Sequence, residues 1–181
     1  VGLSATVVVP HGNNPEKNDA MRALGVELIE HGEDFQEAAE HAQTLATTKG
    51  LHMVASFHPW LVAGVASYGL ELFRATADLG ADLDAVFVAL GMGSGICSLI
   101  QARNALGLKT KIYGVVSENA PAYALSFREG KVVTTESADT LADGVACRSP
   151  NEMAVETILD GAADIITVSE DEIMVATSHY F

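Results

Sequence analysis

Three glycines and a serine lie within five residues near the middle of the chain, at Gly91, Met92, Gly93, Ser94 and Gly95. Glycines let backbone N–H groups converge on an anion, and the serine hydroxyl adds another donor. The unbroken apolar run before them predicts a strand buried on both faces, and the residues after them have helical spacing. Because a helix N-terminus adds positive potential, this pattern predicts a phosphate site. The alternative is a tight turn that binds nothing, although one glycine normally suffices for such a turn.

Two classes of cofactor fit a glycine loop of this kind. A dinucleotide site requires Gly-x-Gly-x-x-Gly and an acidic residue at the end of the next strand. Gly91 and Gly93 fit that pattern, but Ile96 replaces the third glycine and the candidate acid, Glu118, comes late. The missing glycine favours the other class, a cofactor that carries a single phosphate.

The composition limits the classes of function. The 181 residues are 49% hydrophobic, which suits one layered domain or two small ones, and the net charge is −14. So acidic a chain is a poor partner for the nucleic-acid backbone or an anionic membrane. No apolar run is long enough to span a bilayer. Cys97 and Cys147 lack metal-site spacing, so we expect reduced thiols and a cytoplasmic protein.

Predicted strands and helices alternate along the chain, which is typical of an α/β fold with parallel sheets covered by helices on both faces. Asn14 with Pro15, Asp34 with Gly50, and Ser169 with Glu172 mark helix ends. The loop at Ser56–Pro59 is the predicted hinge between units 1–56 and 57–181. Strands are predicted at Ala5–Val9, Val26–Glu30, His52–Val54, Ala85–Leu90, Lys111–Val116 and Ala163–Val168, and helices at Glu16–Leu24, Phe35–Lys49, Trp60–Ala77, Ile96–Leu106, Pro121–Arg128, Asn151–Leu159 and from Ser169.

Several motifs occur in an order that resembles one enzyme family. The glycine loop follows an apolar strand, and further motifs lie on both sides of it: Thr6-Val-Val-Val-Pro10, Met21-Arg-Ala-Leu-Gly25, Thr140-Leu-Ala-Asp-Gly144 and Val168-Ser-Glu-Asp-Glu-Ile173. Together they resemble the pyridoxal-phosphate enzymes of the tryptophan synthase β type (fold type II), the family of threonine and serine dehydratases. The sequence at residues 11–15 and 114–123 is most similar to that of the hydroxyectoine-utilisation dehydratases.

The resemblance implies a site and a reaction. The N–H groups of Gly91–Gly95 and the hydroxyl of Ser94 would bind the phosphate of pyridoxal 5′-phosphate, and Gly144 would lie against its pyridine ring. The full enzyme would be a lyase that eliminates water and ammonia from a hydroxy amino acid, and it would form a homo-oligomer. Residues 1–56 would be part of the family's small domain, and residues 57–181 part of its large, cofactor-binding domain.

The departures from the family pattern concern the catalytic machinery. The family's Schiff-base lysine lies in a Ser-x-Lys-x-Arg-Gly pattern, and none of the five lysines has this context. The Ser-x-Gly-Asn-His loop for the substrate carboxylate is also absent. The chain begins at Val1 without a methionine and ends at Phe181 within a predicted helix. We therefore expect a fragment, truncated at both ends, that lacks a catalytic residue and is inactive alone. The alternative is a non-catalytic phosphate- or dinucleotide-binding α/β module.

Other residues receive plainer interpretations. Some relatives bind a divalent cation through acids at the positions of Val116 and Ala122, so we predict no such metal, with Glu118 leaving some room for one. His11 and His58 are interpreted as loop residues. Cys97 follows a helix N-terminus that could lower its pKa, but a buried, inert thiol is preferred. Tyr123 and Phe127 are assigned to the core.

Overall fold

The computed structural model describes residues 2–180 and divides the chain into two compact units, Val1–Ala55 and Ser56–Phe181. Strands alternate with helices, and every strand pairing within the described residues is parallel. The α/β fold class expected from the sequence is confirmed. Among the residues described, no helix combines the length and apolar character that a membrane crossing requires.

The first unit is a two-stranded parallel sheet with two helices, and local capping residues set the helix ends. Asn14 caps α1 by accepting from the Glu16 N–H at 2.9 Å, and Asp34 caps α2 by accepting from the Glu37 N–H at 2.8 Å. Gly50 ends α2 in the left-handed conformation. These caps confirm the sequence predictions. The elements are β1 (Thr6–Val9), α1 (Pro15–Ala23), β2 (Glu27–Glu30) and α2 (Phe35–Lys49).

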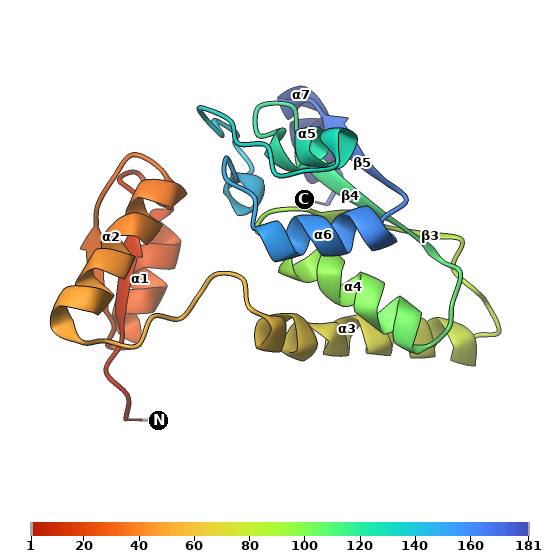
Figure 1. The fold of residues 1–181 in the computed structure, drawn as a ribbon, viewed down its shortest axis with the longest axis horizontal. Helices are drawn as coiled ribbons and strands as arrows, with labels where there is room; N and C mark the ends of the chain where they lie inside the picture. Colours follow the sequence, from red (N-terminus) through yellow and green to blue (C-terminus); the bar gives the residue numbers. More distant parts are fainter. Residues whose placement is uncertain (1, 181) are drawn as a thin grey trace. The chain divides into compact units, whose positions relative to one another are not determined.

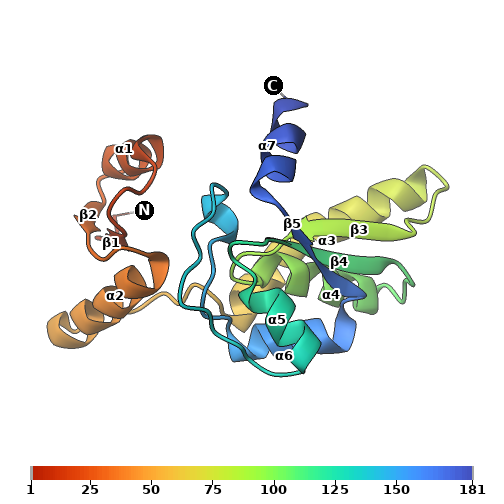
Figure 2. The ribbon, with the colours of Figure 1, turned by 90° about the horizontal axis from the view of Figure 1, so that it is seen from above.

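The second unit carries a three-stranded parallel sheet in the order β3-β4-β5 (Figure 2). Helix α4 packs between α3 and α6 (Figure 1). The last helix begins with the predicted capping box of Ser169 and Glu172. The elements are α3 (Pro59–Asp78), β3 (Ala85–Ala89), α4 (Ser94–Ala105), β4 (Lys111–Ser117), α5 (Ala122–Glu129), the 3₁₀ turn η1 (Asp143–Val145), α6 (Glu152–Gly161), β5 (Asp164–Val168) and α7 (Glu170–Ser178).

The core of the second unit lies where α4 packs on the sheet. Ile96 of α4 is fully buried, and its Cδ1 would lie 3.1 Å from a Cβ added at Gly114 of β4. At Gly161, the last residue of α6, an added Cβ would overlap Ile100 of α4. Glycines at these two points therefore let a strand and a helix approach α4 closely. This packing fixes the start of α4, which borders the glycine loop.

Some sequence predictions were wrong. His52–Val54 forms no strand, because a short apolar run becomes a strand only where a partner strand is available. The predicted strand Ala85–Leu90 ends at Ala89 and is not buried on both faces, since Phe87 is 62% exposed. The last helix ends at Ser178, and Phe181 lies outside the described residues.

Candidate functional site

The glycine loop, Gly91–Gly95, lies at the carboxyl end of β3 and leads directly into α4. Gly93 has φ +97°, a conformation that disfavours any other residue. A Cβ there would also lie 2.8 Å from the Ala154 Cβ. In open parallel sheets, ligands bind beyond the carboxyl ends of the strands, so the loop occupies the expected place.

The loop presents unused hydrogen-bond donors. Within the described part of the chain, the backbone N–H groups of residues 91–96 donate to no protein acceptor, and neither does the hydroxyl of Ser94. The α4 helix starts at Ser94, so its positive end coincides with these donors. A row of free amides at a helix start is suited to a phosphate group.

Gly144 lies against this loop, although it is far away in the sequence. A Cβ added at Gly91 would overlap the carbonyl oxygen of Gly144, so the two backbones touch. A Cβ added at Gly144 itself would meet no atom within 4 Å. The two glycines therefore combine close backbone packing on one side with open space on the other.

A carboxylate fixes the segment that leads to Gly144. Glu170, the first residue of α7, accepts a hydrogen bond from the buried Ser117 hydroxyl. Its second oxygen accepts from the Leu141 N–H at 2.8 Å. Hydrogen bonds from the Ser117 hydroxyl, the Leu141 N–H and the Thr140 hydroxyl, in that order of size, hold the Glu170 pKa below its ordinary value. This ties the segment to the carboxyl ends of β4 and β5.

Two tyrosine hydroxyls hold carbonyls of the loop. The Tyr123 hydroxyl of α5 donates to the Met92 carbonyl at 2.9 Å, and the Tyr68 hydroxyl of α3 donates to the Gly95 carbonyl at 3.1 Å. The sequence assigned Tyr123 only to the core. Its ring is indeed buried, but no local pattern indicates a contact to a residue 31 positions away.

Cys97 and Ile96 are structural residues of the first turn of α4. Cys97 is 1% exposed, and desolvation raises its thiol pKa to about 11 despite the nearby helix N-terminus. The predicted burial of this thiol is confirmed, and the raised pKa is in keeping with an inert role. Ile96 lies in the core and occupies the place of the third glycine of a dinucleotide site. In a dinucleotide site, a glycine at this position allows the helix to pack closely on the strand. Here the Ile96 side chain occupies that space.

Comparison with known proteins decides the family. The model of the pyridoxal-phosphate dependent enzymes matches residues 1–181. The chain belongs to this family. The L-threonine ammonia-lyase of Thermotoga maritima is 32% identical over 173 residues, which cover 95% of this chain and 42% of that protein.

Solved structures of the family share the fold. A threonine deaminase from T.th. has a TM-score of 0.87 and 30% identity over 97% of this chain and 57% of its own. The processed threonine deaminase isoform 2 of Solanum lycopersicum has a TM-score of 0.85 and 31% identity over 97% of this chain and 50% of its own. The chain thus spans about half the length of these relatives.

The observed geometry fits the phosphate end of the family's cofactor. Pyridoxal phosphate carries one phosphate group and a flat ring. The free amides of the glycine loop suit the former, and the open space at Gly144 suits the latter. Val116 and Ala122, the two positions for which the sequence predicted no metal ligand, are both buried apolar residues.

The family's Schiff-base amine has no counterpart at this loop in the second unit. Lys109 and Lys111 lie before or at the start of β4, whereas the glycine loop follows the end of β3. Lys131 comes after the last turn of α5 and pairs with Glu129 at 3.3 Å, whereas Tyr123 in the first turn contacts the loop. Lys17 and Lys49 belong to the first unit.

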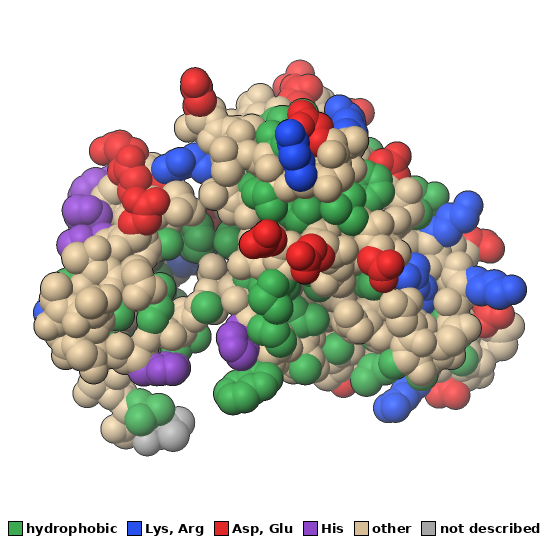
Figure 3. All heavy atoms as spheres, in the orientation of Figure 1, with side chains coloured by type: hydrophobic (Ala, Val, Ile, Leu, Met, Phe, Trp, Pro, Cys, Tyr) green, Lys and Arg blue, Asp and Glu red, His purple; other side chains and the backbone are tan. Residues whose placement is uncertain are grey.

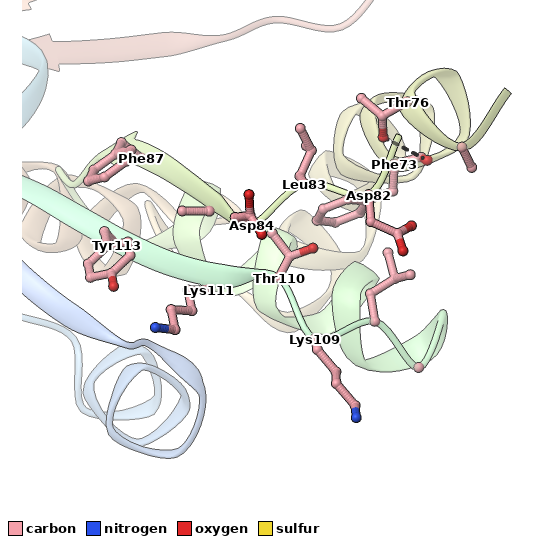
Figure 4. Close-up of a pocket in the computed structure, with 14 residues that line it drawn as sticks. Phe73, Thr76, Asp82, Leu83, Asp84, Phe87, Lys109, Thr110, Lys111 and Tyr113 are labelled. Atoms are coloured by element: carbon pink, nitrogen blue, oxygen red, sulfur yellow. Dashed lines mark hydrogen bonds between the residues drawn. The ribbon is translucent and has the colours of Figure 1, made fainter. Parts of the chain in front are cut away.

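A cavity lies where β3 and β4 begin, at the opposite end of the strands from the glycine loop. This cavity of about 620 Å³ is lined by residues at the starts of β3 and β4, among them Asp84, Lys111 and Phe87. Figure 4 shows Lys109 and Lys111 extending from it and the rings of Phe87 and Tyr113 side by side. The cavity includes no residue of the glycine loop, so it is separate from the candidate cofactor site.

Acidic side chains are spread over the face of the second unit that Figure 3 draws. On the face drawn in Figure 3, Asp and Glu side chains of the second unit are scattered among Lys, Arg and hydrophobic side chains. The net charge of −14 is compatible with an anion bound at the glycine loop. Salt screens the distant charges, whereas the backbone dipoles of the loop act on the anion over a few ångströms.

Proposed function

We propose that this chain is the cofactor-binding part of a pyridoxal-phosphate-dependent dehydratase or ammonia-lyase. The full enzyme eliminates water and ammonia from a hydroxy amino acid of the threonine or serine type. The observation that carries the proposal is the row of free amides in residues 91–96 beside the open space at Gly144. The activities for which the relatives are named, L-threonine ammonia-lyase and threonine deaminase, support the reaction class.

The residues of the chain act mainly by binding and orienting. The loop amides and the Ser94 hydroxyl bind the phosphate, and the α4 N-terminus adds favourable potential. Gly144 leaves open space where the ring would lie, and a side chain would occupy that space. When bound, the cofactor supplies an electron sink for the charge that develops at the substrate α-carbon. By the family resemblance, moving the proton at that carbon would need an amine, and the lysines of the second unit lie away from this loop.

Binding is tested with ligands that lack an aldehyde, because pyridoxal phosphate reacts with any exposed lysine. We expect pyridoxamine 5′-phosphate to bind residues 1–181 at least about tenfold more tightly than pyridoxamine, since charge-assisted hydrogen bonds are the strong ones. Isothermal titration calorimetry measures both. Equal affinities, or tighter binding of NAD than of pyridoxamine 5′-phosphate, would contradict the proposal and favour the dinucleotide alternative.

Turnover is tested separately. Residues 1–181 supplied with pyridoxal phosphate should release no ammonia from threonine, serine, 3-hydroxyaspartate or hydroxyectoine-derived acids, because none of the five lysines has the family's Ser-x-Lys-x-Arg-Gly context. Ammonia release above that from free cofactor would show that a lysine of this chain acts as the Schiff-base amine. The last of these substrates is included because residues 11–15 and 114–123 resemble hydroxyectoine-utilisation dehydratases.

We also propose that the full enzyme acts in the cytoplasm as a homo-oligomer on a small amino acid, without nucleic-acid or membrane partners. Two buried, unpaired cysteines are compatible with a reducing compartment. Large exposed apolar side chains such as Trp60, at 84%, are compatible with subunit contacts. Light scattering of the full enzyme measures its oligomeric state.

A further inference from the structure

The peptide bond between Met92 and Gly93 is held from its carbonyl side. The Tyr123 hydroxyl donates to the Met92 carbonyl oxygen at 2.9 Å. In a trans peptide unit the carbonyl and the following N–H point in opposite directions. Fixing the Met92 carbonyl on Tyr123 therefore aims the Gly93 N–H away from α5, on the side of the loop that carries no protein acceptor.

The same hydroxyl connects the loop to α6. It accepts from the Asn151 N–H at 3.2 Å, and the Asn151 side chain caps α6 by accepting from the Ala154 N–H at 3.3 Å. Ala154 in turn is the residue whose Cβ limits Gly93 to a hydrogen. One phenol thus satisfies an acceptor of the glycine loop and a donor at the start of α6.

The environment keeps this phenol protonated and in place. Tyr123 is 1% exposed, and desolvation raises its pKa, so its hydroxyl is protonated and able to donate at neutral pH. If the Met92 carbonyl turned toward the ligand side, its lone pairs would repel a phosphate. The hydroxyl removes this alternative by giving the carbonyl a buried partner.

We propose that Tyr123 is a positioning residue for the cofactor phosphate, acting through the Met92–Gly93 peptide rather than by touching the ligand. This inference rests on the proposed function. Nothing in its local sequence distinguishes Tyr123 from a core aromatic. Its role follows from one hydroxyl that bridges two segments at the carboxyl edge of the sheet.

Tyr68 is the natural comparison. Its hydroxyl donates to the Gly95 carbonyl at 3.1 Å, but the Ser98 hydroxyl donates to the same oxygen at 2.7 Å. Removing the Tyr68 hydroxyl leaves Gly95 with a partner, whereas removing the Tyr123 hydroxyl leaves Met92 with none in the described residues. The two tyrosines should therefore differ in their effect on phosphate binding.

The test compares Tyr123→Phe with the unsubstituted chain, using pyridoxamine 5′-phosphate and pyridoxamine. We expect Tyr123→Phe to weaken binding of the phosphorylated ligand about tenfold and to leave pyridoxamine unchanged, since a lost buried hydrogen bond has about this effect. Tyr68→Phe should lose about threefold or less. Tyr113→Phe, whose ring stacks on Phe87 at 5.0 Å on the outer side of the sheet, should lose nothing.

The outcomes separate this inference from the proposed function. If the unsubstituted chain binds the phosphorylated ligand selectively and Tyr123→Phe does so equally well, Tyr123 is not a positioning residue and the function stands. A loss that is equal for both ligands would indicate a purely structural role. Absence of selective binding by the unsubstituted chain overturns both.

A measurement on the unsubstituted chain covers the case in which Tyr123→Phe does not fold. The Gly93 amide should then move downfield in nitrogen–proton NMR spectra when pyridoxamine 5′-phosphate is added, and should move much less with pyridoxamine. An unchanged Gly93 amide at saturating ligand would overturn the inference.

Discussion

Gly91 and Gly144 are in backbone contact beside the candidate site, and they differ in what a methyl group would meet. At Gly91 the added carbon would overlap a backbone carbonyl, which cannot rotate away. At Gly144 it would enter open space. Alanine substitutions at the two positions should therefore distinguish an effect on packing from an effect on ligand binding.

Gly91→Ala should reduce the free energy of unfolding by about 1–3 kcal/mol, as overpacking does, and should abolish selective binding of pyridoxamine 5′-phosphate. Gly144→Ala should change stability by less than about 0.5 kcal/mol and still weaken binding, because its methyl takes the space of the ring. Urea denaturation and calorimetry measure these effects. A harmless Gly91→Ala would show that the segments separate easily, and unimpaired binding by Gly144→Ala would exclude a ring at this place.

Single residues also show where sequence reasoning stops. The free donors of the glycine loop follow from residue type and order, and the structure places them at a helix start as expected. The hydroxyl of Tyr123 does not follow, because its partners at Met92 and Asn151 come from distant segments. Residue type identifies which groups could bind an anion, but only the fold identifies which groups orient them.

Among the elements, α7 fixes the segment that leads to Gly144. Its first residue, Glu170, bonds to Ser117 at the end of β4 and to Leu141 in the segment before Gly144. Since the pKa of this carboxyl is lowered on folding, its charged form stabilises the fold above its ordinary pKa of about 4.5. That contribution is lost as the pH falls through the lower value of the folded state.

Glu170→Gln should lower the urea midpoint at pH 7 slightly, because Glu170 is only half-buried and solvent screens its interactions. It should also flatten the decline in stability below about pH 4.5, since the variant has no carboxylate to protonate here. Urea titrations at pH 7 and at about pH 3.5 measure the difference, with the exposed Glu156→Gln of α6 as the control. An acid decline that is identical to that of the unsubstituted chain would contradict this role.

Local signals account for the elements that the sequence predicted well. Asn14, Asp34 and Ser169 each bond to an N–H within the next three residues, so both partners lie in one short window. The strand predicted at His52–Val54 failed because strand formation depends on a partner elsewhere. The exposed face of β3 escaped prediction for the same reason, since an apolar run does not reveal which of its faces is covered.

For the molecule as a whole, the sheet of the second unit retains an open apolar surface. Phe87 is 62% exposed on β3, which is an edge strand within the described residues. Exposed edge strands with apolar side chains are prone to pair with other chains. The isolated chain should therefore self-associate as its concentration rises.

Phe87→Ser should reduce this self-association and leave binding of pyridoxamine 5′-phosphate unchanged, because Phe87 lies on the exposed face of β3, whereas the glycine loop follows the carboxyl end of that strand. Analytical ultracentrifugation over a concentration series measures the association. Leu24→Ser is the matched control, since Leu24 is 84% exposed but follows a helix of the first unit. Equal association of both variants and the unsubstituted chain would locate the contact elsewhere.

The touching backbones of Gly91 and Gly144 belong to segments separated by a strand, two helices and a long loop. Contacts between such distant segments form late, because the loop-closure entropy must be overcome first. The anion site is thus completed only near the end of folding. A phosphate ligand should therefore slow unfolding and leave the refolding rate almost unaltered.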